Sequence, residues 1–270
     1  RDGRMSERRI AAGIEYCGRD FQGWQRQAAG PTIQHAVEYA LSRVANGPIQ
    51  VLCAGRTDAG VHARQQVIHF DPAVERKPRA WVLGSNVNLP SQISVMWARE
   101  VNEGFHARFS ALERAYQYII LNRDARPGLL TGRVTWECRP LDEQRMQLAA
   151  VCLRGEHDFS AYRAIHCQAR NPVRIVNFLE IRRHDAFLAI DIRANGFLHH
   201  MVRNIAGVLM MIGLGQKPVS WAQAVLDSRQ REQGGVTAPA AGLYLTGIKY
   251  PREFGIPEAA AGRWPDLAIA

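Results

Sequence analysis

Residues 49–63 read Ile49-Gln50-Val51-Leu52-Cys53-Ala54-Gly55-Arg56-Thr57-Asp58-Ala59-Gly60-Val61-His62-Ala63. The first six residues favour a β-strand, and the small residues that follow allow the backbone to turn tightly. Two glycines enclose Arg56, Thr57 and Asp58. The segment therefore predicts a loop, at the end of a strand, from which a guanidinium, a hydroxyl and a carboxylate project.

This loop has two interpretations on its residues alone. An Arg-x-Asp pair at the edge of a sheet can keep the carboxylate of Asp58 ionised while one of its oxygens stays available to react. Alternatively, Asp58 caps a turn and Arg56 is its partner at the surface. The glycine spacing lacks the Lys-Ser/Thr that would follow in a phosphate-binding loop, so a P-loop is excluded.

Outward from this loop, the first half of the chain alternates strands and helices. Thr32 is the predicted N-cap of the first helix, and Asn46-Gly47-Pro48 ends it. The expected elements are strand 10–16, loop 21–27, helix 33–45, strand 49–54, strand 67–70, helix 78–85 and strand 93–101. This order predicts a β-α-β-α-β-like half.

The second half starts with an aromatic-rich strand and contains a hairpin around His184-Asp185. The expected elements are strand 114–121, helix 141–154, strands 173–183 and 187–194, helix 199–214, helix 221–229 and strand 243–250. Residues beyond Pro251 are rich in Ala, Gly and Pro and predict an irregular tail. Two α+β halves with antiparallel sheets are the simplest interpretation.

Composition narrows the class of protein. The 270 residues are 47% hydrophobic and 22% charged, which is typical of a packed globular protein. No stretch reaches the length of apolar sequence that a membrane helix needs, and no signal peptide opens the chain. We expect a soluble, cytoplasmic protein. The net charge of +9, with arginine predominant, favours a polyanionic partner.

The cysteines argue against two kinds of scaffold. Five cysteines, widely spaced and without a C-x-x-C pair, favour neither a disulfide framework nor a zinc ribbon. Cys152, His157, His166 and Cys167 lie close in sequence, but their spacing fits no common zinc pattern. We therefore expect no metal site and no cofactor.

Several motifs occur together in one order along the chain. The loop motif Ala-Gly-Arg-Thr-Asp-Ala-Gly-Val-His-Ala at 54–63 is one of them. The others are Gly23-Trp24-Gln25-Arg26-Gln27, Asn88-Leu89-Pro90, Phe105-His106-Ala107-Arg108-Phe109-Ser110, His199-His200-Met201-Val202-Arg203-Asn204 and Gly242-Leu243-Tyr244-Leu245. Together they span about residues 10–250, nearly the whole chain. In these motifs and in their order, the sequence resembles the TruA family of tRNA pseudouridine synthases.

The resemblance implies a fold and an activity. The fold is two RNA-recognition-like α/β-plait subdomains with antiparallel sheets, side by side, with a basic active-site cleft between them. We place the first at 7–110, the second at 111–250 and the irregular tail at 251–270. The activity is conversion of uridine to pseudouridine in the anticodon stem-loop of tRNA, at positions 38, 39 and 40, by a cofactor-independent homodimer.

The resemblance also implies site residues. Asp58 corresponds to the catalytic aspartate, which attacks the uracil ring, attacks C1′ or removes a sugar proton. Arg56 corresponds to the arginine that takes the place of the flipped base. Tyr116 would stack on the uracil, Leu243 would pack on its other side, and Arg203 would pair with Asp58.

Structural roles compete with some of these assignments. Tyr116 and Leu243 could equally be core residues of a sheet. Tyr118 shares the strand face of Tyr116 and fits packing better. We interpret His199 and His200 as structural.

RNA binding is expected from exposed turns on which basic and aromatic residues interleave. The candidates are Arg76, the loop Phe105, His106, Ala107, Arg108 and Phe109, and the loop His166, Cys167, Gln168, Ala169 and Arg170.

Two other functions fit part of the pattern. A non-catalytic RNA-binding protein would keep the plaits and the basic charge, but it has no need of a carboxylate aimed at RNA. A hydrolase that uses Asp58 and His62 is the third hypothesis.

Overall fold

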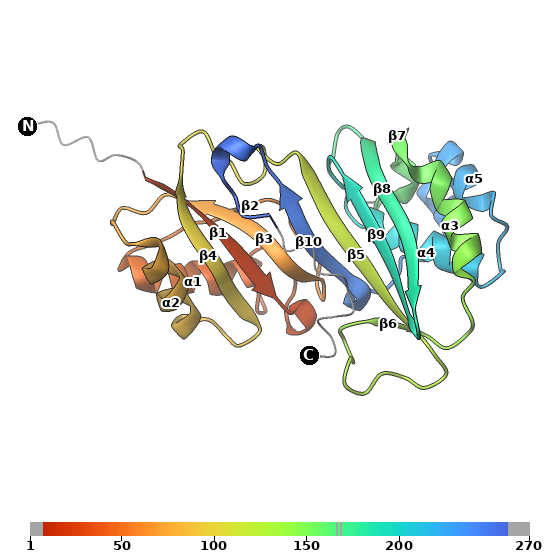
Figure 1. Cartoon of the computed structure of the whole chain (residues 1–270), viewed down its shortest axis with the longest axis horizontal. Coiled ribbons are helices and arrows are strands. Elements are labelled where there is room, and N and C mark those ends of the chain that lie inside the picture. The colour runs from red at the N-terminus through yellow and green to blue at the C-terminus, as the bar shows by residue number, and fades with distance from the viewer. Residues whose placement is uncertain (1–7, 166, 168, 259–270) are drawn as a thin grey trace, which may run out of the picture. The chain divides into compact units, whose positions relative to one another are not determined.

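The computed structural model describes residues 8–165, 167 and 169–258 (Figure 1). The chain divides into two compact units. Among the described residues, unit 1 contains 8–112 and 245–258, and unit 2 contains Glu113–Tyr244. The last strand, β10 (Leu243–Lys249), contains the boundary, so most of it belongs with the N-terminal unit, whereas the sequence pattern places it in the second half.

Unit 1 has the topology of an α/β plait. Its elements are β1 (Arg9–Tyr16), α1 (Ile33–Ala45), β2 (Leu52–Cys53), β3 (His62–Phe70), α2 (Pro78–Asn88) and β4 (Ile93–Val101). The strands lie in the order β4-β1-β3, and β2 pairs with β3. All these pairs are antiparallel, as the β-α-β-β-α-β arrangement requires.

Helix α1 shows why the sequence folds this way locally. The Thr32 side chain accepts a hydrogen bond from the His35 backbone N–H, which satisfies one unpaired donor at the helix start. Ile33, Val37 and Leu41 share the buried face at helical spacing. Asn46 ends the helix in the left-handed conformation at φ 52°, so the cap and the stop are both confirmed.

The strand expected at 49–54 is much shorter than predicted, because α1 takes its backbone donors. The Ile49 N–H donates to Ser42 Oγ at 2.9 Å, and the Val51 N–H donates to the Glu38 carboxylate at 3.1 Å. Only Leu52–Cys53 pairs with β3. Strand β3 in turn begins at His62, five residues before the predicted start at 67.

Unit 2 combines an antiparallel sheet with three α-helices. Its elements are β5 (Glu113–Asn122), β6 (Thr135–Glu137), α3 (Glu143–Ala150), β7 (Gly155–Asp158), β8 (Val173–His184), β9 (Phe187–Ala194), α4 (Met201–Gly213) and α5 (Trp221–Ser228). The sheet order is β5-β9-β8-β7, and the short β6 pairs with β5 in parallel. The mixed α and β composition is therefore confirmed.

Unit 2 departs from the prediction at three places. Strands β6 and β7 are too short to give a periodic signal, and the sequence did not predict them. The helix expected at 141–154 is α3 followed by a 3-10 turn, Val151–Leu153. Asp142 caps α3 by accepting from the Arg145 N–H at 3.0 Å, so the helix starts two residues later than expected.

Six short 3-10 helices complete the described secondary structure. They are η1 (Gly18–Asp20), η2 (Val151–Leu153), η3 (Ser160–Tyr162), η4 (Arg231–Gly234), η5 (Ala240–Gly242) and η6 (Arg252–Phe254).

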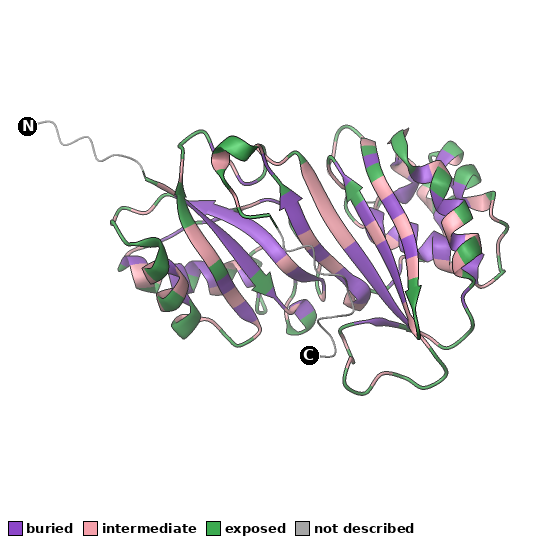
Figure 2. Cartoon of the chain, in the orientation of Figure 1, coloured by how far each residue is buried: buried purple, intermediate pink, exposed green. Residues whose placement is uncertain are grey.

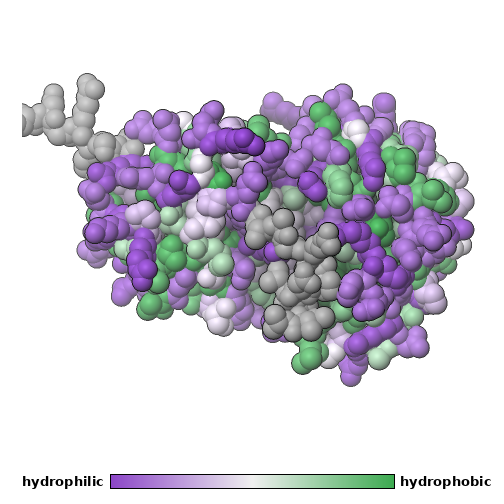
Figure 3. All heavy atoms as spheres, viewed as in Figure 1, coloured by the Kyte–Doolittle hydropathy of each residue, from purple (hydrophilic) through white to green (hydrophobic). Residues whose placement is uncertain are grey.

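Apolar side chains are buried in both units. Figure 2 shows buried residues along many of the strands and on parts of the helices. On β9, the alternation that the sequence predicted is observed except at one position: Leu188, Ile190 and Ile192 are buried, and Asp191 and Arg193 are less so, but Ala189 is also buried. Hydrophilic side chains cover most of the face seen in Figure 3. Among the described residues, no helix combines the length and apolar character needed to cross a membrane.

Candidate active site

The loop after β2 is held by residues on both sides of Asp58. Before it, Thr57 is buried, its Oγ1 lies 2.8 Å from the Tyr16 hydroxyl, and its carbonyl accepts from the Trp24 N–H at 3.0 Å. After it, the Asp58 carbonyl accepts from the Val61 N–H at 3.1 Å. Asp58 itself is half-buried, and the backbone on both sides of it is fixed by these hydrogen bonds.

Gly23 brings a second stretch of backbone directly against this loop. It has φ +87°, and a Cβ placed on it would lie 2.7 Å from the Thr57 oxygen and 3.0 Å from the Asp58 carbonyl carbon. Only glycine accommodates both the left-handed conformation and this approach. The Gly-Trp motif at 23–24 therefore supports the Asp58 loop by contact between main chains.

Two polar side chains of β3 serve the same scaffold. The His62 Nδ1 accepts from the Gly18 N–H at 3.1 Å, and the residue is buried at the start of the strand. Four residues later, the Gln66 Nε2 donates to the Gly55 carbonyl at 2.6 Å. The bond to Gly18 gives His62 a structural role, and it disfavours the hydrolase hypothesis, which needs this imidazole as an acid or base.

Two candidate arginines place positive charge near the loop. Burial raises the pKa of the Cys53 thiol to about 12, and the charges of Arg56 and Arg108 act against that rise. Both charges thus act on the same thiol, although Arg56 and Arg108 are far apart in sequence. Both residues are exposed. The structure thus brings the predicted base-flipping arginine and one predicted RNA-binding arginine to the same part of unit 1.

The loop at 105–109 divides into buried and exposed residues. Phe105 and Ala107 are fully buried, and the Ala107 N–H donates to His69 Nδ1 at 3.1 Å. Their side chains hold the loop in place and are not presented to a ligand. Phe109 is 77% exposed, with its ring centroid 4.3 Å from that of His106 and the Arg108 guanidinium 5.7 Å from it. A cation and two rings are therefore available at the surface.

The other predicted RNA-binding residues are spread over both units. Arg76 is exposed in unit 1, where its guanidinium donates to the Glu75 carbonyl at 3.1 Å. In unit 2, Arg170 is exposed, and the Ala169 carbonyl accepts from Arg163 at 3.4 Å. The Cys167 N–H donates to the Ala164 carbonyl at 3.0 Å. His166 and Gln168 lie outside the described residues.

Tyr116 and Tyr118 lie on β5 but differ in surroundings. Tyr118 is fully buried, and its hydroxyl lies within hydrogen-bonding distance of Thr135 Oγ1 and of the Pro239 carbonyl, 2.9 Å away. Burial raises its pKa, and the Arg203 charge lowers it. Tyr116 is half-buried, edge-on to Phe197 at 5.0 Å between centroids. Tyr118 is therefore a packing residue, while part of the Tyr116 side chain stays accessible.

Arg203 lies in the first turn of α4 and bonds to a segment that we call the strap, residues 235–242. Its Nε donates to the Ala238 carbonyl at 2.8 Å, and its own carbonyl accepts from the Ala238 N–H at 3.1 Å. The Tyr118 hydroxyl holds the next residue of the strap, Pro239. Backbone and side chain of Arg203 are thus fixed against one point of the strap.

Asn204, the residue after Arg203, also holds the strap in place. Asn204 is 1% exposed. Its amide donates to the Tyr162 carbonyl at 2.8 Å, and its Oδ1 accepts from Thr237 at 2.7 Å and from Arg231 at 3.1 Å. Arg231 also donates to the Gly235 carbonyl at 2.8 Å. This part-buried polar network, centred on the buried Asn204, fixes the strap on α4.

The strap leads directly to Leu243. Gly242 precedes it, and a Cβ at Gly242 would lie 2.7 Å from the Ile119 carbonyl, so the chain passes closely over β5. Leu243 is 6% exposed at the start of β10. Within unit 2, the structure therefore connects Arg203, Leu243 and β5 through one segment.

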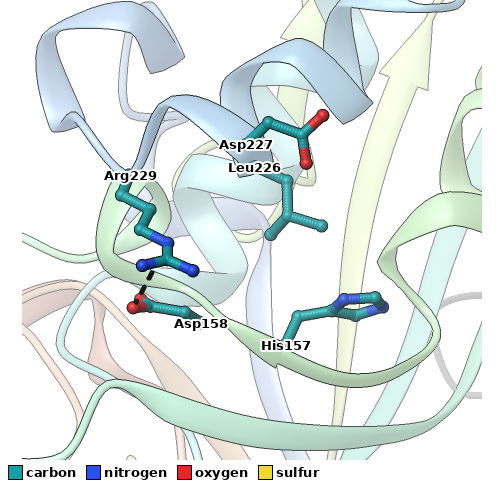
Figure 4. A pocket seen from close by; sticks show the side chains of 5 residues that line it. All are labelled: His157, Asp158, Leu226, Asp227 and Arg229. Atoms are coloured by element: carbon teal, nitrogen blue, oxygen red, sulfur yellow. Dashed lines mark ion pairs between the residues drawn. The ribbon is translucent and has the colours of Figure 1, made fainter.

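Unit 2 also contains a pocket that is lined by none of the predicted site residues. It has a volume of about 340 Å³ and is lined by His157, Asp158, Leu226, Asp227 and Arg229. Figure 4 shows Asp158 and Arg229 pointing toward one another, at 3.7 Å. His157 bonds to the Arg154 carbonyl at 2.7 Å. None of these residues belongs to the predicted catalytic set.

Sequence reasoning did not identify the residues that support the site. Tyr16 bonds to a residue 41 positions away and Gln66 to one 11 positions away, while Arg231 and Thr237 bond to Asn204 across 27 and 33 positions. Each is an ordinary residue of its element. Asn204 lies within a motif that the sequence analysis singled out, and burial of an amide among apolar neighbours was the available signal.

Comparisons with known proteins agree on one family. The sequence model of the family described as tRNA pseudouridine synthase matches residues 12–110 and 149–251. A relative named tRNA pseudouridine synthase A from Pseudomonas aeruginosa is 56% identical over 255 residues, covering 94% of this chain and 90% of the relative. One of the same name from Nitrosococcus oceani is 56% identical over 249 residues, covering 92% and 96%.

Solved structures give a weaker similarity. A structure of an H/ACA RNP bound to a substrate RNA containing 2′-deoxyuridine aligns with a TM-score of 0.32 at 12% identity. The alignment covers 74% of this chain and 44% of that chain, so this protein spans less than half of its length. The family match and the close relatives, by contrast, extend over most of the sequence. The chain therefore belongs to the TruA family of tRNA pseudouridine synthases.

Proposed function

We propose that this protein converts uridine to pseudouridine in the anticodon stem-loop of tRNA, at positions 38, 39 and 40, with Asp58 as its catalytic carboxylate. Membership of the family makes the protein an isomerase that acts on uridine in tRNA. The observation that carries the assignment to Asp58 is its loop. Asp58 is half-buried, Thr57 before it is buried, and the turn after it is closed by the hydrogen bond from the Val61 N–H to the Asp58 carbonyl. The positive charges of Arg56 and Arg108 both act on Cys53, at the end of the preceding strand.

The proposed reaction rearranges one nucleotide without a group donor. The C1′–N1 glycosidic bond breaks, the uracil turns, and a new bond forms between C5 and C1′. The proton on C5 is lost and N1 gains one, so the product is an isomer of the substrate. Asp58 acts by attack on the ring, by attack on C1′ or by removal of a sugar proton, and all three roles require the ionised carboxylate.

Other residues are proposed to hold the flipped nucleotide. A base inside an RNA helix must leave its stack to reach a carboxylate, which costs a few kcal/mol. Arg56 would occupy the vacated position. The accessible part of the Tyr116 ring would stack on the uracil, Leu243 would pack on its other side, and Arg203 would pair with Asp58. Support comes from the half-buried Tyr116 and from the strap that fixes Arg203 and Leu243 in one unit.

Binding of the tRNA backbone is assigned to exposed basic loops. Arg76, Arg108 and Arg170 are exposed, and Phe109 adds an accessible ring beside Arg108. Such groups neutralise phosphates and stack on bases. A homodimer, a cytoplasmic location, the absence of a cofactor and a cleft between two side-by-side plaits all stay predictions.

The experiment that tests this function maps the product on RNA. Purified protein, treated with a chelator, is incubated with an unmodified tRNA transcript that carries uridine at positions 38, 39 and 40, and pseudouridines are located by chemical probing. The proposal expects modification at these positions. Pseudouridine only elsewhere in the tRNA would contradict the site assignment, and restoration of lost activity by zinc would contradict the absence of a cofactor.

A non-catalytic RNA-binding protein is the second hypothesis. It predicts bound tRNA and no pseudouridine in the same assay. The supported Asp58 loop argues against it, because a carboxylate adjacent to RNA repels phosphate and weakens binding unless it takes part in the reaction.

A further inference from the structure

Thr57 is the residue through which the Asp58 loop is attached to the sheet of unit 1. Its carbonyl accepts from the Trp24 N–H at 3.0 Å, and its Oγ1 lies 2.8 Å from the Tyr16 hydroxyl. The two contacts fix the peptide plane and the side chain of the residue directly before Asp58. The orientation of the next Cα–Cβ bond follows from that backbone.

Tyr16 is well suited to hold Thr57 because it is itself immobilised. It is the last residue of β1, where it pairs with Ala63 of β3 and with Ile93 of β4. Its side chain is 3% exposed, and its ring lies 6.0 Å from that of Trp24. The hydroxyl is therefore carried on a rigid ring at the end of a central strand.

The hydrogen bond between these hydroxyls lies out of reach of water. Both residues are buried, and either oxygen can donate to the other. At a buried position, no water molecule can replace a hydrogen bond that is removed, so the loss of the bond costs free energy. Removal of either hydroxyl therefore breaks this buried bond and lets the Thr57 side chain rotate, which loosens the backbone at Asp58.

We propose that Tyr16, acting through Thr57, is a positioning residue that sets the orientation of the Asp58 carboxylate. This inference rests on the proposed role of Asp58. A carboxylate that must reach a ring atom, C1′ or a sugar proton works only within a narrow range of distances, and a displacement of about 1 Å can cost about a hundredfold in rate. Neither hydroxyl needs to touch the RNA for this effect.

The test compares Tyr16→Phe with a buried tyrosine elsewhere. Tyr162 of unit 2 is also fully buried, and its hydroxyl donates to the Ala222 carbonyl at 3.0 Å, so Tyr162→Phe loses a comparable bond. Single-turnover rates with saturating enzyme, the Kd for an unmodified tRNA transcript and the urea midpoint are measured for both. We expect the Tyr16→Phe rate to fall by about ten- to a hundredfold, while Tyr162→Phe keeps the wild-type rate within about twofold. The Kd should stay within about twofold for both.

Substitutions of Thr57 separate positioning from a structural role. Thr57→Val removes the hydroxyl and should lower the rate as much as Tyr16→Phe, whereas Thr57→Ser restores it and should keep most of the rate. The double variant Tyr16→Phe/Thr57→Val should be no slower than either single variant, because one bond is lost in all three. Equal losses in rate and urea midpoint for Tyr16→Phe and Tyr162→Phe would overturn the proposal.

Asp58→Asn distinguishes failure of this inference from failure of the proposed function. If Asp58→Asn is inactive and Tyr16→Phe turns over at the wild-type rate, the positioning role is overturned and the catalytic role of Asp58 stands. If Asp58→Asn retains turnover, both are overturned. A slow Tyr16→Phe with a normal Thr57→Val would also overturn it, because Tyr16 would then act by another route.

Discussion

The Asp58 loop of unit 1 and the strap of unit 2, to which Arg203 bonds, are both held in place by neighbouring residues, but by different kinds of contact. The Asp58 loop rests mainly on main-chain contacts, in which Trp24, Gly23 and Val61 approach or bond to residues 57–59. The strap is held by a side-chain network in which Asn204 and Arg231 bond to Thr237 and Gly235.

This difference predicts how each region responds to substitution. A network of buried side chains loses several bonds when one member is removed, and its remaining polar groups are left without partners. A loop held mainly by main-chain contacts tolerates most side-chain changes, and it is sensitive to changes that alter the backbone or the bond between Tyr16 and Thr57. We therefore expect damage to the strap to appear first in stability, and damage to the Asp58 loop to appear first in turnover.

Asn204→Ala should have the largest effect on stability. It leaves the Tyr162 carbonyl, Thr237 and Arg231 without a shared partner in a buried site, which predicts a loss of about 2–4 kcal/mol in the free energy of unfolding. Urea titration measures it. Asn177→Ala is the matched control, because the exposed Asn177 bonds only to Glu113 among the contacts described, and it should cost under about 0.5 kcal/mol. Equal losses would show that the network does not hold the strap.

Gly23→Ala should break the main-chain support of the Asp58 loop. The added Cβ would approach the Thr57 oxygen and the Asp58 carbonyl carbon at a positive φ, which predicts a loss of about 1–3 kcal/mol in stability. The turnover of the folded fraction should fall as well. Gly47→Ala is the control, since a Cβ there meets no atom within 4 Å. Wild-type turnover in folded Gly23→Ala would refute the support that we assign to residue 23.

Tyr116→Leu tests whether the accessible ring on β5 acts on substrate. Loss of stacking, worth about 1–3 kcal/mol, predicts a roughly ten- to hundredfold slower single turnover with the fold retained. The thermal midpoint and the rate are measured on one preparation. Tyr39→Leu, at an exposed position of α1, should change neither. A destabilised but fully active Tyr116→Leu would identify Tyr116 as a packing residue.

The last prediction concerns the dependence of the stability of unit 1 on pH. Burial, together with the charges of Arg9 and His106, lowers the pKa of His69 from 6.5 to about 4. Because the unfolded state binds the proton more readily, stability is fully present above pH 6.5 and declines as the pH falls toward 4. His69→Gln should flatten this decline in urea titrations, whereas substitution of the exposed His184 should leave it unchanged. A wild-type slope in His69→Gln would contradict the assignment.

The sequence predicted the parts of this molecule that depend on local pattern. The cap at Thr32, the stop at Asn46 and the alternation on β9 are local, and the structure contains all three. The predicted strand 49–54 was too long, because the backbone N–H groups of Ile49 and Val51 bond to the side chains of Ser42 and Glu38. An apolar pattern does not reveal such bonds. Strands β6 and β7 were not predicted, because three or four residues are too few to show a periodic pattern.

For the candidate site, only residues that lie in continuous sequence motifs could be predicted. Arg56, Asp58 and Arg203 stand in recognisable motifs. The supports at Tyr16, Gln66 and Arg231 depend on contacts between residues distant in sequence, which one sequence does not record. Burial also changed the interpretation of a predicted loop: Phe105 and Ala107 hold it, while Arg108 and Phe109 are exposed.

The central claim is that the Asp58 carboxylate carries out the isomerisation, and single turnover of Asp58→Asn tests it most directly. Release of tritium from C5-labelled uridine in tRNA is followed with the enzyme in excess, and tRNA binding is measured on the same preparation. Because the amide keeps the shape of the side chain but removes its charge, we predict no detectable tritium release and a Kd within a few-fold of wild type. Appreciable release by Asp58→Asn, with pseudouridine formed, would contradict this account.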